Sequence, residues 1–102
     1  MFDNTLVLAG VLSKAPQRTV SPSGIPHCQF VLEHRSQQIE ANMPRQAWCR
    51  IKVVASGEEL KQQTDYLQLG SQIRVSGFIS RVESRNGVSQ LVLHAQQIDR
   101  ID

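Results

Sequence analysis

The sequence is poor in the residues that build metal sites and catalytic centres. It has 2 cysteines and 3 histidines, and neither a CxxC nor an HxxxH spacing that would assemble a zinc site. The GxxxxGK[ST] and GxGxxG patterns that cradle phosphates are absent, and no serine or cysteine stands in a recognised nucleophile motif. We therefore expect no metal, no cofactor and no enzymatic activity.

Long hydrophobic runs are missing as well. No apolar run approaches the roughly 20 residues that a membrane-spanning helix requires, so we expect no membrane association. The N-terminal stretch MFDNTLVLAGVLSKAP carries an early Asp3 and no basic segment, which is unlike a secretory signal peptide. We expect a cytoplasmic protein in which Cys28 and Cys49 are reduced thiols that behave as small apolar groups.

Aromatic residues make up only 5% of the chain, and the formal net charge is only +2. A length of 102 residues with 40% hydrophobic content fits a single globular domain over residues 1–102. The small net charge says little about a partner. The basic residues, however, cluster in the middle of the chain and in one late segment, so their placement is more informative than their number.

Apolar runs and period-two alternation predict strands separated by turn-forming residues. A loop is expected over Ser36–Pro44, and a short helix over Ser56–Leu67 with Ser56 as its N-cap. The pair Asn86-Gly87 predicts a hairpin between the last two strands. The predicted strands are Thr5–Ser13, His27–Arg35, Met43–Val54, Gln72–Ser80 and Val88–His94, the last running on towards Ile98.

This order of elements predicts an all-β fold, a five-stranded Greek-key barrel with a short helix between strands three and four. Gly10 and Gly77 interrupt two of the strands, as expected where a small barrel bends sharply. The position of the helix favours the oligonucleotide/oligosaccharide-binding (OB) fold. An SH3-like barrel is the structural rival, but it has no natural place for that helix.

The third predicted strand combines the only tryptophan with positive charge. Alternation along MPRQAWCRIKVV puts Trp48 on one face with Arg50 and Lys52, and Arg45 lies just before it. An indole beside cations is suited to stack on a nucleobase while the cations hold the neighbouring phosphates. The structural alternative is an indole that packs under a loop or against a second subunit.

The other basic residues fall on elements that border one groove of such a barrel. Its second and third strands form the binding face, and the loops joining strands one to two and four to five flank it. His94 is out of phase with its apolar neighbours and either faces the groove or is a surface histidine, and Phe78 is similarly out of phase. The basic residues on these elements are Lys14, Arg18, Arg35, Arg45, Arg50, Lys52, Arg81 and Arg85.

Several segments of the chain resemble a known family. They are VSPSGIPHCQFVLEHRS at 20–36, RQAWC at 45–49, GFIS at 77–80 and VLHA at 92–95. On these segments the chain is similar to the primosomal replication protein N (PriB) family, whose members resemble single-stranded DNA-binding protein in fold. The resemblance implies DNA-contacting roles for Lys14, Ser21, Arg35, Arg45, Trp48 and His94.

The same resemblance implies a non-catalytic homodimer that binds single-stranded DNA without strong sequence preference. It further implies a role in stabilising the restart helicase on DNA and in bridging to later primosome proteins. The chain departs from the family pattern in the late hairpin, where Glu83 and Gln90 replace lysines, and at Met43, which replaces a phenylalanine.

Two other functions remain open from the residues. One is a protein-binding scaffold whose Trp48 face docks a partner. The other is an RNA-binding barrel of the cold-shock type, although such barrels carry several aromatic residues on the binding face and this sequence predicts only Trp48 there.

Overall fold

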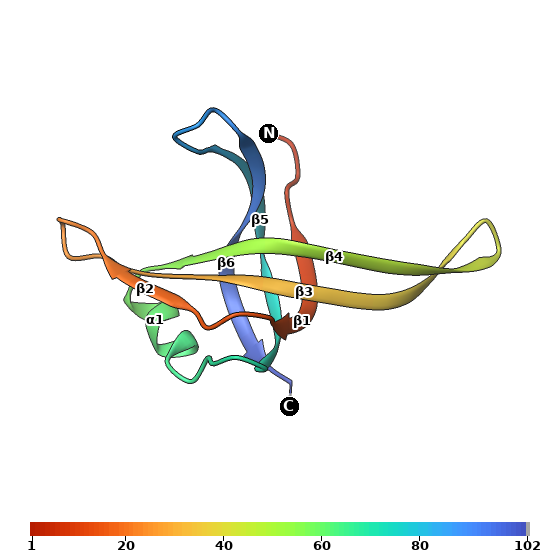
Figure 1. Ribbon diagram of the computed structural model, residues 1–102, viewed down its shortest axis with the longest axis horizontal. Helices are drawn as coiled ribbons and strands as arrows, with labels where there is room; N and C mark the ends of the chain where they lie inside the picture. The colour runs from red at the N-terminus through yellow and green to blue at the C-terminus, as the bar shows by residue number, and fades with distance from the viewer. Residues whose placement is uncertain (102) are drawn as a thin grey trace.

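The computed structural model describes residues 1–101, and these residues form a closed β-barrel. The strand order is β1-β5-β6-β4-β3-β2, and an additional pairing between β1 and β3 closes the barrel (Figure 1). β2 is a short strand that pairs only with β3. The strands are β1 Leu6–Leu12, β2 Gln17–Val20, β3 Pro26–Glu40, β4 Met43–Ser56, β5 Gln72–Glu83 and β6 Ser89–Arg100, and the helix is α1 Glu58–Thr64.

The core lies inside the barrel and is built mainly from alternate residues of β3, β4 and β5, with residues of β1, β6 and the helical segment added. The side chains of Leu12, Leu32, Val53, Ile73 and Leu93 are 0% exposed. Leu60 of α1 joins this cluster, and the helix covers one end of the barrel (Figure 1). The helix lies between β4 and β5, which correspond to the predicted third and fourth strands. Because successive strand residues point to opposite faces, burying this set turns the intervening residues towards solvent.

Two glycines allow the strands to approach one another closely. A Cβ atom on Gly77 would clash with the backbone carbonyl of His94, and one on Gly10 would clash with the carbonyl of Glu33. Gly77 also lies at the register shift between β5 and β6. Both glycines are therefore required by the path of the backbone, in agreement with their predicted place at bends of the barrel.

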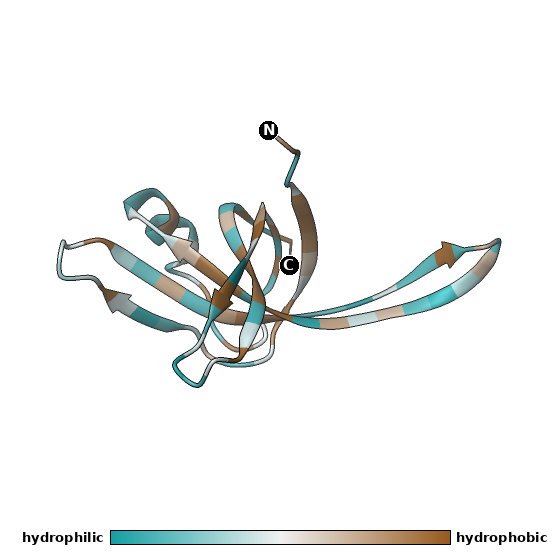
Figure 2. Ribbon diagram, turned by 90° about the horizontal axis from the view of Figure 1, so that it is seen from above, coloured by the Kyte–Doolittle hydropathy of each residue, from teal (hydrophilic) through white to brown (hydrophobic). Residues whose placement is uncertain are grey.

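The predicted loop over residues 36–44 is wrong. β3 continues to Glu40, β4 begins at Met43, and only Ala41 and Asn42 connect them, with φ angles of 51° and 63°. Positive φ at both central residues is the geometry of a tight hairpin turn. The two strands form a ribbon that projects well beyond the barrel (Figures 1 and 2). Because both of its faces meet solvent, its sequence lacks the hydrophobic period by which a strand is recognised.

Three smaller predictions can be compared with the structure. The helix begins at Glu58 with Gly57 as its N-cap, so Ser56 is not the cap, and it ends at Thr64. The prediction missed β2, all of whose residues are exposed. The hairpin at Asn86-Gly87 is confirmed, since β5 and β6 pair up to Glu83 and Ser89.

The described part of the chain holds no helix long and apolar enough to cross a membrane.

Candidate nucleic-acid interface

Trp48 lies on the outer face of the β3–β4 ribbon, where it meets the barrel. It is 55% exposed, so within residues 1–101 it is not packed under a loop. Its cross-strand partner on β3 is Arg35, and the next pair on the same face joins Glu33 to Arg50. The predicted alternation of this strand is therefore confirmed for Trp48 and Arg50, and the structure adds Arg35 directly opposite the indole.

The charges around Trp48 are organised by one carboxylate. Glu33 accepts a hydrogen bond from Arg50, with 3.2 Å between Oε2 and Nε, and its Oε1 lies 3.5 Å from Nη2 of Arg35. The guanidinium carbon of Arg50 lies 5.5 Å from the centroid of the Trp48 ring. Glu33 therefore holds two guanidinium groups, and one of them, that of Arg50, lies over the Trp48 ring.

Lys52 extends the basic face along β4. Its cross-strand partner is Val31, and it lines a shallow hollow of about 210 Å³ together with Lys14, Gln17 and Gln29. The structure thus brings together two lysines that lie far apart in the sequence. The outer face of β3 and β4 presents, in order, Arg35, Trp48, Arg50, Lys52 and the neighbouring Lys14.

A second aromatic surface continues this face onto β6 and β5. Val54 of β4 pairs with His94 of β6, and His94 pairs in turn with Phe78 of β5. The rings of Phe78 and His94 are stacked, with centroids 4.9 Å apart and an angle of 11° between their planes. Phe78 is 37% exposed. The out-of-phase positions of both residues therefore place them on the outer surface of the barrel, next to the basic face.

Arg45 does not join this group. It pairs with Gln38 on the opposite face of the ribbon, and its Nε donates to Oε1 of Glu40 at 3.0 Å. The prediction that Arg45 lies beside the indole is wrong, because Arg45 lies three positions before Trp48 and an odd spacing reverses the face of a strand.

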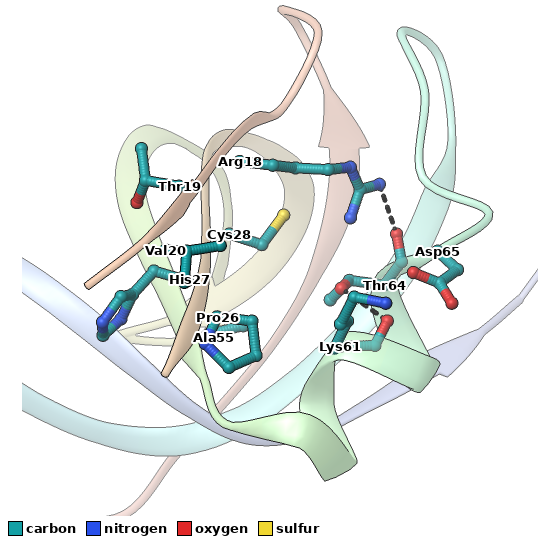
Figure 3. A pocket seen from close by; sticks show the side chains of 10 residues that line it. All are labelled: Arg18, Thr19, Val20, Pro26, His27, Cys28, Ala55, Lys61, Thr64 and Asp65. Atoms are coloured by element: carbon teal, nitrogen blue, oxygen red, sulfur yellow. Dashed lines mark hydrogen bonds between the residues drawn. The ribbon is translucent and has the colours of Figure 1, made fainter. Parts of the chain in front are cut away.

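Arg18 also points elsewhere. Its Nη2 donates to the backbone oxygen of Thr64 at 2.7 Å, at the C-terminal end of α1 (Figure 3). It lines a cavity of about 250 Å³ between β2, β3 and α1, into which Cys28 also faces (Figure 3). Burial raises the pKa of the Cys28 thiol, and the positive charge of Arg18 partly opposes this. The structure therefore places Arg18 at the end of the helix and not with Trp48.

Ser21 shapes the turn between β2 and β3. Its Oγ accepts a hydrogen bond from the backbone N–H of Ile25 at 3.1 Å and lies 3.0 Å from Oγ of Ser23. These contacts occupy the hydroxyl within its own turn.

The β5–β6 hairpin carries the last two predicted cations. β6 pairs with β4 from Lys52 to Val54, so the hairpin leaves the barrel next to the Trp48 strand (Figure 1). Nη2 of Arg81 lies 3.2 Å from Oε1 of Glu83, and Arg85 is exposed in the turn. The hairpin therefore borders the basic face, but one of its cations is already neutralised.

Glu33 and Phe78 are not among the site residues that the sequence predicts, yet both lie on or next to this face. The signal for Glu33 was present, because alternation along His27–Arg35 puts it on the same face as Arg35. Within residues 1–101, no group of 3 or more His, Cys, Asp or Glu side chains is arranged to hold a metal ion.

Comparison with known proteins places the chain among relatives of the same length. A family model described as another single-strand binding protein family matches residues 4–97. The replication restart protein PriB of Photorhabdus laumondii is 60% identical over 102 residues, which span 100% of this chain and 97% of the relative. The chain belongs to the PriB family. A PriB protein of Yersinia pseudotuberculosis is 57% identical over the same shares of both chains.

Solved structures of PriB and single-stranded DNA-binding proteins establish the fold. PriB from Ralstonia solanacearum superimposes with a TM-score of 0.78 at 22% identity, covering 98% of this chain and 100% of the other. The single-stranded DNA-binding protein of Plasmodium falciparum, solved with single-stranded DNA, gives a TM-score of 0.83 at 14% identity, covering 100% and 97%. The predicted OB-fold is confirmed.

Proposed function

We propose that the chain binds single-stranded DNA along the outer face of β3 and β4, without strong sequence preference and without a catalytic step. The observation that carries this proposal is the exposed indole of Trp48, with Arg35 opposite it on β3 and the guanidinium group of Arg50 over its ring. Every base offers a π face for stacking, so an indole platform binds all bases, while guanidinium groups bind the backbone that all sequences share.

The same geometry favours single strands over duplex DNA. The Trp48 ring lies on the surface of a sheet, and a base must be unstacked from its neighbours to cover it. In a duplex both faces of each base are already stacked, and opening a pair costs a few kcal/mol, roughly as much as stacking on one aromatic side chain returns.

The titration of Trp48 fluorescence tests this function. The chain has 1 tryptophan, so tryptophan emission, excited selectively over Tyr66, reports the candidate site alone. We expect quenching by oligo-dT and much less by a duplex of equal length. Stronger binding to oligo-U than to oligo-dT would favour the RNA-binding alternative, and emission that no nucleic acid changes would favour a protein-docking face.

The proposed function includes a homodimer. One barrel offers a short binding face, and a symmetric pair would double it through an isologous interface. The resemblance to the PriB family supports this assembly. Light scattering at micromolar concentration should give about twice the 11.4 kDa chain mass, and a mass of one chain would contradict it.

We also infer a place in replication restart, because relatives that are 60% and 57% identical to this chain carry the name replication restart protein PriB. In this role the chain stabilises the restart helicase on DNA and bridges to later primosome proteins. The dwell time of the purified helicase on forked DNA should lengthen when the chain is added. An unchanged dwell time would count against this role while leaving DNA binding intact.

A further inference from the structure

Four ion pairs within residues 1–101 join an arginine of the predicted site to a nearby carboxylate. Arg45 pairs with Glu40 and Arg81 with Glu83, one to one. Glu33 differs because it is shared: its two oxygens hold Arg35 at 3.5 Å and Arg50 at 3.2 Å. The pairs are Arg35–Glu33, Arg50–Glu33, Arg45–Glu40 and Arg81–Glu83.

The position of Glu33 differs from that of the arginines it holds. The Glu33 side chain is 21% exposed, whereas the side chains of Arg35 and Arg50 are 75% and 60% exposed. The carboxylate therefore lies closer to the sheet than the more exposed guanidinium groups of Arg35 and Arg50, which belong to the same face of the ribbon as Trp48. A strand of DNA stacked on the indole would bring its phosphates to the same two guanidinium groups.

We propose that Glu33 is an internal competitor of the DNA phosphates, and so a positioning residue that weakens binding at the Trp48 face. This inference rests on the proposed function. Its carboxylate occupies N–H donors of Arg35 and Arg50 in the free protein, and its negative charge stays beside the phosphates in the complex. A guanidinium has five N–H donors, so contact with a phosphate is possible without complete release of Glu33. The carboxylate thus sets how much phosphate binding each arginine contributes.

This competition has a consequence for transfer of DNA. When a phosphate leaves, Glu33 can take its place on the guanidinium, so release of DNA does not leave the two arginines without a partner. Dissociation is therefore faster than for a face with the same cations and no carboxylate. A protein that must hand DNA to a following factor benefits from such reversible binding.

The experiment compares Glu33→Gln with two matched variants by anisotropy of labelled oligo-dT over a range of salt concentrations. Glutamine keeps the shape and one acceptor oxygen but removes the charge. Glu40→Gln breaks an ion pair on the opposite face of the ribbon, and Glu59→Gln removes one charge from the exposed side of α1.

We expect Glu33→Gln to bind oligo-dT roughly 3- to 10-fold more tightly at low salt. Its affinity should also fall more steeply as salt increases, because more counterions are released when both arginines contact phosphate. The gain should shrink in an Arg50→Ala background, since the competition then has one arginine fewer to act on. Equal tightening by Glu40→Gln or Glu59→Gln would show a general effect of net charge and would overturn the proposal.

A second measurement tests the carboxylate without DNA. Iodide is an anionic quencher, so its quenching of Trp48 reports the local positive potential, and neutral acrylamide reports exposure. Glu33→Gln should raise quenching by iodide and leave quenching by acrylamide unchanged. Should Glu33→Gln fold poorly, Glu33→Thr is a second variant, since a β-branched side chain suits a strand.

The outcomes separate this proposal from the function on which it rests. If wild-type protein binds oligo-dT through Trp48 and Glu33→Gln shows unchanged affinity, the competition is wrong and the interface stands. If wild-type emission does not respond to oligo-dT, the interface and the competition both fall.

Discussion

Replacing Trp48 with alanine is the most direct test of the candidate interface. Base stacking on an aromatic side chain contributes ~1–3 kcal/mol per base. Since about 1.4 kcal/mol corresponds to a tenfold change in affinity, Trp48→Ala should weaken binding to oligo-dT by roughly 5- to 150-fold. We expect a loss of at least about tenfold, because Trp48 is the one large exposed aromatic ring on β4 and its direct cross-strand partner, Arg35, is not aromatic.

The same substitution should leave the fold nearly unchanged. Trp48 is 55% exposed and lies outside the core cluster, so truncating it opens no cavity in the barrel. Its contact with Arg50, at 5.5 Å, is a cation–π interaction worth about 0.5–1 kcal/mol at an exposed site. A loss of binding in this variant can therefore be assigned to the interface, provided that its thermal melt stays close to that of the wild type.

Because the variant lacks the only tryptophan, binding is measured by anisotropy of labelled oligo-dT. Trp48→Phe is the matched control, since it retains a π face and should keep most of the affinity. Unchanged affinity in Trp48→Ala would refute the assignment of this face as the binding site.

Three further predictions follow from the positions of single side chains. Arg35→Ala should weaken binding to oligo-dT more than Arg45→Ala, because only the first lies on the face of Trp48; anisotropy titrations compare the two. Glu83→Lys should tighten binding and steepen the salt dependence by roughly 0.7 per added phosphate contact, because it frees Arg81 and adds a cation, and a salt titration measures the slope. Burial raises the pKa of Cys28 above its ordinary 9.0, so the unfolded thiol ionises first as the pH rises. The contribution of this thiol to the free energy of unfolding is therefore complete below about pH 9 and is lost as the pH rises through the folded pKa. Urea melts at about pH 8 and about pH 10 would measure this loss.

Each of these has a result that contradicts it. Equal losses in Arg35→Ala and Arg45→Ala would show that both faces of the ribbon contact DNA. An unchanged slope in Glu83→Lys would mean that the hairpin does not approach the strand. For Cys28, the control is Cys28→Ala, in which the alkaline decline should be smaller; an identical decline would assign it to other groups.

The sequence by itself determined the class of fold and the orientation of the central strand. Alternation is a local property, since each residue of a strand points opposite to the one before it. It therefore sufficed to turn Trp48, Arg50 and Lys52 outward while Val53 joins the core. The turn chemistry of Asn86-Gly87 was likewise local and located the last hairpin correctly.

Other features needed the fold because they join residues far apart in the chain. Arg18 was predicted to face the DNA, but its guanidinium reaches the carbonyl of Thr64, 46 residues later. No local pattern contains that contact, which depends on where α1 packs across the barrel. The stacking of Phe78 on His94 depends in the same way on the pairing of β5 with β6.

The tertiary structure decided above all which strand residues lie opposite one another. The ribbon turns at Ala41 and Asn42, and this turn fixes the register that sets Arg35 against Trp48 and Glu33 against Arg50. A one-residue slip of the register between β3 and β4 would set residues of opposite faces against each other. Alternation gives the face of each residue within its own strand. The register between strands depends instead on the turn and on closure of the barrel. For this reason only the structure showed that Glu33 lies between Arg35 and Arg50.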